Sequence, residues 1–255
     1  MRIGNSALGK NANVVFNVGT TSFQKKASLN IQRGSSLTIA QGATFTFTGS
    51  STFDVFGTLK YENTSAFLEI ASNMTIANTG NVVLSNALSI AKGGTVTIDA
   101  RSDGSAAISM ASTGNGRVIL NGGRLKIASK NALAVDQIGL YAGSSSTLEL
   151  SARNEINNVY FNPNTKLALV LTGADASAFI KSFGGTVDLT IEGFANEKVF
   201  FDDNGWWDRA KITATDGSKT YTKEQLELVA TTGEMTSQGK YVLSLITVPE
   251  PAEYA

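Results

Sequence analysis

A short pattern, in which a turn residue is followed by alternating polar and apolar residues, recurs roughly every 6 to 9 residues through the first two thirds of this 255-residue chain. Such spacing leaves room for a strand of about three to five residues and a bend, but not for a crossover helix. The chain is therefore expected to be all-β, either a meandering antiparallel sandwich or barrel, or a coil in which every third strand stacks on its predecessor. Clear copies of the pattern lie at residues 34–39, 42–47, 51–55, 57–61, 66–70, 73–76, 80–84, 87–90 and 94–98.

The distance between equivalent apolar residues decides between these two architectures. When the strands are grouped in threes, equivalent positions recur at about 22 residues, a period typical of solenoids. We therefore predict a right-handed parallel β-helix with three strands per coil, in which each strand pairs with the equivalent strand about 4.8 Å away. An antiparallel sandwich is the alternative, and its two-residue hairpins would fall at residues 103–104 and 121–122. The steps that give the period run from Ile39 to Tyr61 to Leu84, from Phe47 to Ile70 to Ile90, and from Val55 to Ile76 to Ile98.

The repeats become less regular toward the C-terminus. They weaken after Leu150, and from Glu192 onward acidic and aromatic residues concentrate. The end of a solenoid leaves strand edges unpaired, so a less regular terminal segment is expected to cover it. We therefore predict that residues 1–191 form the β-helix, residues 192–248 a C-terminal cap, and residues 249–255 a separate tail.

The N-terminal end shows no comparable capping segment. Val14, Phe16 and Val18 already follow the strand pattern, which predicts that the native coil begins upstream of Met1. An open coil also favours end-to-end self-association, because stacking on a second copy would pair the exposed strand edges.

Composition removes several classes of function. Lys plus Arg and Asp plus Glu number 21 each, so the formal net charge is zero and no basic field is available to attract nucleic acid. The absence of His and Cys excludes His-dependent catalytic triads, His or thiolate metal sites, and disulfides. The sequence contains no phosphate-binding, dinucleotide-binding or EF-hand motif, and we expect neither a cofactor nor a resident metal ion.

Carboxylate chemistry is the enzymatic route that this composition leaves open. Parallel β-helices include polysaccharide lyases and glycosidases, whose sites gather acidic groups on one outer face. The threefold grouping places Asp54 and Asp99 on one sheet, two coils apart. The simpler interpretation is that these acidic residues are isolated surface charges in contact with solvent. A carbohydrate-active enzyme is therefore the alternative hypothesis. The outward acidic positions of the regular region are Asp54, Glu69 and Asp99, with Arg101 and Asp103 nearby.

A cluster of acidic and aromatic residues in the predicted cap is the main candidate binding site. In this cluster Asp202, Asp203 and Asp208 flank Trp206 and Trp207. In a glycan-binding loop, the Trp rings would stack on sugars and the carboxylates would bind hydroxyls or Ca²⁺. The simpler interpretation is that the Trp rings and the nearby Phe rings plug the end of the apolar column.

The end of the sequence carries a further motif, Pro249-Glu250-Pro251, directly after Val248. This motif resembles the start of the PEP-CTERM sorting signal of Gram-negative bacteria, in which the tripeptide precedes an apolar helix and a basic cluster. The resemblance implies an exported protein that exosortase-type machinery delivers to the cell surface, the outer membrane or the extracellular matrix. The repeat style is also similar to the β-helical passenger regions of autotransporters and adhesins.

Together these features favour a non-enzymatic exported surface or extracellular-matrix protein, a β-helical rod for adhesion or display. The expected partners are glycan or matrix ligands and the sorting machinery, whereas nucleic acid is not expected. The outer sheets, or insertions such as residues 100–105 and 142–146, are expected to bind the ligand.

Overall fold

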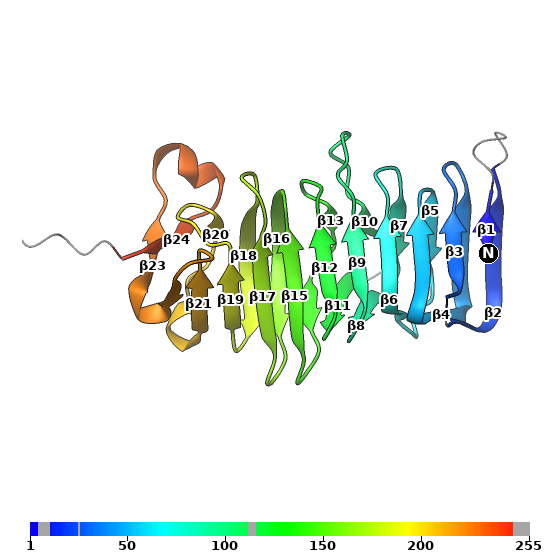
Figure 1. Cartoon of the computed structure of the whole chain (residues 1–255), viewed down its shortest axis with the longest axis horizontal. Coiled ribbons are helices and arrows are strands. Elements are labelled where there is room, and N and C mark those ends of the chain that lie inside the picture. The colour runs from blue at the N-terminus through cyan, green and yellow to red at the C-terminus, as the bar shows by residue number, and fades with distance from the viewer. Residues whose placement is uncertain (5–10, 25, 112–115, 247–255) are drawn as a thin grey trace, which may run out of the picture.

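The computed structural model of the chain describes residues 1–4, 11–24, 26–111 and 116–246. Strands make up 58% of it and helix 5%, and the strands form a parallel β-solenoid of about nine turns, consistent with a right-handed β-helix. Figure 1 shows the coils stacked along the long axis, from the blue N-terminal coil at one end to the orange and red segment at the other. The predicted parallel β-helix is therefore confirmed.

Three parallel sheets run along the solenoid, and we call them the first, second and third faces. Long strands bend at a corner and contribute to more than one face. The first face contains parts of β2 (Asn13–Phe23), β4 (Ser36–Val55), β16 (Arg153–Phe161) and β18 (Ser177–Gly185), with β5 (Thr58–Tyr61), β7 (Asn81–Leu84), β10 (Ile108–Met110), β13 (Leu133–Ala134) and β20 (Val199–Phe201). The second face contains further parts of β2, β4, β16 and β18, with β6 (Leu68–Ile76), β8 (Ala87–Ala91), β11 (Arg117–Asn121) and β14 (Ile138–Leu140). The third face contains the ends of β4 and β6, with β1 (Arg2–Ile3), β3 (Ser28–Ile31), β9 (Thr95–Ile98), β12 (Arg124–Ile127), β15 (Ser145–Leu150), β17 (Lys166–Leu171), β19 (Asp188–Glu192) and β21 (Lys211–Thr215).

The observed register matches each predicted step of the period. All of the side chains in these steps are fully buried, because alternate residues of a strand point to opposite sides and only the inward ones face the shared interior. The inward residues of successive coils therefore stack into one apolar column. The matched pairs are Ile39 with Tyr61 and Tyr61 with Leu84, Phe47 with Ile70 and Ile70 with Ile90, and Val55 with Ile76 and Ile76 with Ile98.

The two dipeptides expected in antiparallel hairpins lie between parallel strands instead. Gly122 has a φ of 79° at the corner between β11 and β12, and both of these strands pair in parallel with strands of neighbouring coils. Glycine suits this corner because it adopts positive φ without a Cβ penalty. Asp103 and Gly104 lie in the loop between β9 and β10.

A buried asparagine binds successive coils together at a corner. The side chain of Asn154 donates hydrogen bonds from Nδ2 to the carbonyl oxygens of Ser129 and Ala152, at 2.9 and 3.2 Å. Its Oδ1 accepts a hydrogen bond from the backbone N–H of Ala132 at 3.0 Å. A bend exposes backbone groups that the strand ladders cannot reach, and a single buried amide satisfies several of them here.

The C-terminal end changes from parallel to antiparallel pairing. The parallel first and third faces continue through β20 and β21, beyond residue 192, where the sequence predicted the start of the cap. Strand β22 then pairs antiparallel with β21, and β24 pairs with β20 and β23. This pairing covers strand edges that would otherwise be free. The remaining elements are η2 (Trp207–Arg209), β22 (Thr220–Thr222), η3 (Lys223–Gln225), β23 (Leu226–Ala230), η4 (Gly233–Ser237) and β24 (Tyr241–Leu245).

We expect Gly80→Ala to destabilise the solenoid and Gly139→Ala to be tolerated. A Cβ atom at Gly80 would clash with the carbonyl oxygen of Val55, a backbone atom that moves only if the coil moves. A Cβ atom at Gly139 would meet only the end of the Gln137 side chain, at 3.3 Å. Thermal denaturation followed by circular dichroism should therefore show a lower Tm for Gly80→Ala alone. Equal Tm values for the two variants would contradict this packing.

Asn154→Ala should lower the free energy of unfolding by about 1–3 kcal/mol, because it leaves buried backbone groups without partners. Asn73→Ala is the matched control, since it removes the same amide from an exposed position in β6. A denaturant titration measures both losses. A loss for Asn154→Ala no larger than that for Asn73→Ala would argue against the role of the buried amide.

Candidate functional site

Trp206 lies at the C-terminal end of the apolar column and is only 6% exposed. Its ring centroid is 4.6 Å from that of Phe183 and 4.9 Å from that of Phe201. Its Nε1 donates a hydrogen bond to the carbonyl oxygen of Asp203 at 2.7 Å. This burial supports the interpretation of Trp206 as a core plug, and too little of the ring is exposed to stack on a sugar.

The other residues of the predicted glycan-binding loop lie in the same turn. Trp207 is half-buried, and the Lys223 ammonium lies 5.3 Å from its ring centre. That ammonium also donates hydrogen bonds to the carbonyl oxygens of Trp207 and Asp208, at 2.5 and 2.9 Å. The carboxylate of Asp203 accepts a backbone hydrogen bond within the turn at 3.0 Å, whereas Asp202 is half-buried. The predicted residues are thus brought together, but several of their groups serve to build the turn itself.

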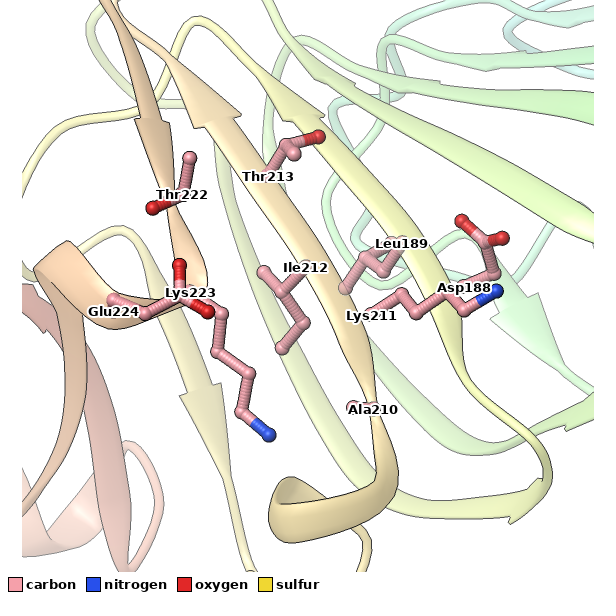
Figure 2. A pocket seen from close by; sticks show the side chains of 9 residues that line it. All are labelled: Asp188, Leu189, Ala210, Lys211, Ile212, Thr213, Thr222, Lys223 and Glu224. Atoms are coloured by element: carbon pink, nitrogen blue, oxygen red, sulfur yellow. The ribbon is translucent and has the colours of Figure 1, made fainter.

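A hollow of about 270 Å³ lies beside this turn, between β19, β21 and η3 (Figure 2). Asp188 of β19 pairs directly with Lys211 of β21, and Figure 2 shows both side chains on one side of the hollow. Lys223 and Glu224 extend from η3 on the other side. The two positive and two negative charges balance, so this hollow offers little net attraction for an ion.

The outward carboxylates of the regular coils do not align. Asp54 pairs with Thr75, and Thr75 pairs with Thr97 in the following coil. Asp99 lies two residues beyond Thr97, so it is two coils from Asp54, as predicted, but two residues out of register with it. Glu69 lies on the second face. In the ranges that the structure describes, no group of three or more acidic side chains is placed to hold a metal ion.

A further concave region lies at the corner between the third and first faces, in the N-terminal half of the solenoid. Two hollows of about 730 and 440 Å³ share the residues Arg33, Phe56, Asn78 and Thr79. We call this continuous depression, which these four residues line, the corner groove. Its larger hollow exceeds in volume the hollow of about 500 Å³ that Tyr160, Asn164 and Lys166 line.

Unequal corner lengths explain why a groove forms at this position. Residues 32–35 connect β3 to β4 and residues 77–80 connect β6 to β7, whereas residues 56–57 alone connect the end of β4 to β5. The short middle corner lies between two longer ones, and Phe56 is 39% exposed within it. Gly57 makes this packing feasible, because a Cβ atom there would clash with backbone carbonyl oxygens of the 32–35 corner.

Arg101 anchors the longer loop that closes one end of the corner groove. Its side chain is 2% exposed and donates hydrogen bonds to the carbonyl oxygen of Gly80, to Asn81 at 3.2 Å and to Ser105 at 2.8 Å. The Asp103 carboxylate lies 3.4 Å from its Nε. Hydrogen bonds from the backbone and side chain of Ser105, together with this guanidinium, hold the pKa of Asp103 below its usual range. The charged groups of Arg101 and Asp103 therefore both stabilise the loop.

The sequence pattern predicts residues 100–105 as a binding insertion but does not indicate Arg33, Phe56 or Asn78. The one local signal of this site in the sequence is an aromatic residue, Phe56, at a turn position directly after the inward Val55. The convergence of these side chains depends on the stacking of corners that lie about 22 residues apart in the sequence.

No known family model, curated protein or solved structure matches the chain significantly. The motif Pro249-Glu250-Pro251 lies outside the residues that the structure describes. Within those residues, no helix has the length and apolar character needed to span a bilayer.

Trp206→Ala should lower the free energy of unfolding by about 3–5 kcal/mol, because it empties a large volume inside the core. Trp207→Ala should cost less, since that ring is only half-buried. Chemical denaturation of the two variants beside the unmodified chain measures the difference. A larger loss for Trp207→Ala would contradict the assignment of Trp206 as the plug.

Proposed function

We propose that the chain is a non-enzymatic protein of the bacterial cell surface or extracellular matrix, a β-helical rod for adhesion or display. The observation that carries the proposal is the corner groove. It combines an exposed aromatic ring, a guanidinium, an amide and a hydroxyl group on one concave surface. This combination suits a polar ligand that has apolar ring faces, as glycans have.

The scaffold supports a binding role because it holds the groove in place. Each corner is bounded by strands that pair with the coils on both sides, and Thr79 donates a hydrogen bond from its hydroxyl to the carbonyl oxygen of Phe56 at 2.8 Å. A preformed site loses little conformational entropy when a ligand binds. Asp103 is the carboxylate among the described lining residues, and hydrogen bonds from Ser105 together with Arg101 hold its pKa below the usual range, whereas acid–base catalysis requires a side chain that exchanges protons near neutral pH.

Export and sorting by exosortase-type machinery are part of the same proposal, and they rest on the motif Pro249-Glu250-Pro251. Fractionation of the native bacterium, with an antibody against this chain, should find the protein outside the cytoplasm. Accumulation in the cytoplasm would contradict export. End-to-end self-association stays a prediction, and light scattering over a concentration series measures it.

An array of glycans and matrix proteins tests the adhesive function. The purified chain should bind a subset of the array, and polysaccharides incubated with it should gain neither reducing ends nor unsaturated products. Release of such products would favour the alternative, a carbohydrate-active enzyme using surface carboxylates. Failure to bind any member of the array would contradict adhesion.

A further inference from the structure

We propose that the corner groove binds an acidic polysaccharide, with Phe56 stacking on a sugar ring and Arg33 pairing with a sugar carboxylate. This inference rests on the proposed adhesive function and names both its site and its ligand class.

The groove runs along the solenoid axis, across the corners of successive coils. Arg33, Phe56 and Asn78 belong to three consecutive corners, and Arg101 follows in the fourth. Since coils are about 4.8 Å apart, the three steps from the first corner to the fourth span about 14 Å. One sugar residue of an extended polysaccharide is comparable in length to one coil step. Consecutive sugars of an extended chain can therefore meet consecutive corners.

Phe56 supplies the apolar contact within this row. Its exposed ring borders both hollows, and it lies between the longer corners that contribute Arg33 on one side and Asn78 on the other. The faces of a sugar ring carry C–H groups that pack on aromatic rings, while amide and hydroxyl groups such as those of Asn78 and Thr79 bond to sugar hydroxyls. The groove thus offers both kinds of contact that a glycan uses.

The acidic class of the ligand follows from the charges along the groove. Arg33 is exposed, and it makes no hydrogen bond or ion pair with any residue that the structure describes. Asp103 is the carboxylate among the described lining residues, and its charge is offset by Arg101 and by the hydrogen bonds from Ser105. Among the described residues that line the groove, Arg33 is therefore the charge without an ionic partner. A guanidinium binds a carboxylate through two parallel hydrogen bonds, which suits a uronate sugar.

Calorimetric titration with oligosaccharides of three uronate polymers, polygalacturonate, alginate and hyaluronate, tests the inference. A methyl-esterified galacturonan of equal length serves as the neutral counterpart. We expect the unmodified chain to bind at least one acidic polymer more tightly than the neutral one. Arg33→Gln should weaken acidic binding about tenfold and leave neutral binding unchanged. Phe56→Ala should weaken both, whereas Phe56→Tyr, which keeps the ring, should retain binding.

Two variants control for changes of charge and aromatic surface elsewhere. Arg209→Gln removes an exposed arginine from η2, and Phe67→Ala removes a ring that is 39% exposed, as Phe56 is, but lies at another corner. Both should leave the affinity for the acidic polymer within about twofold of that of the unmodified chain. Circular dichroism confirms that each variant is folded.

The outcomes separate this inference from the proposed function. Binding to matrix proteins or neutral glycans, but to none of the three acidic polymers, would overturn the inference and leave adhesion standing. Acidic binding that survives Arg33→Gln and Phe56→Ala undiminished would place the site elsewhere and also overturn it. Failure to bind any array member or acidic polymer would overturn both.

Discussion

Parallel pairing between successive coils is the constraint on which every other feature of this structure depends. The pairing sets each inward residue over its counterpart in the next coil, as in the row from Val55 through Ile76 to Ile98. A slip of one residue would turn the inward side chains to solvent and the outward ones into the core. The strands must therefore keep both their alternation and their register, whereas the corners between them are free to change in length.

Because the corners can vary in length, they give each solenoid its particular surface shape. The corner from the third to the first face contracts to residues 56–57 in one coil and widens to a loop anchored by Arg101 two coils later. Because the strands on either side stay in register, the difference in corner length becomes a depression in the outer surface. Binding residues are commonly carried on such connections while a rigid scaffold positions them.

The last parallel coil imposes a different requirement, because antiparallel strands follow it along the chain in place of a further coil. At the C-terminal end, Trp206 packs with Phe183 and Phe201, while antiparallel strands pair with the last parallel edges. Near the N-terminal end, the Phe47 ring stacks between those of Phe23 and Phe53, with centroid distances of 4.6 and 4.5 Å. A run of acidic and aromatic residues is thus ambiguous in sequence, and burial distinguishes a plug from a sugar platform.

The sequence by itself determined the class of fold, the period and the identity of the inward residues. Alternation and spacing are properties of the linear chain, so the steps from Ile39 to Tyr61 to Leu84 follow from the sequence alone. Only the tertiary structure decided that Trp206 is buried, that Asp99 is two residues out of register with Asp54, and that Arg33 and Phe56 share a groove. Each of these depends on register or on the relative lengths of neighbouring corners. Such relations between segments about 22 residues apart exist only once the coils have stacked.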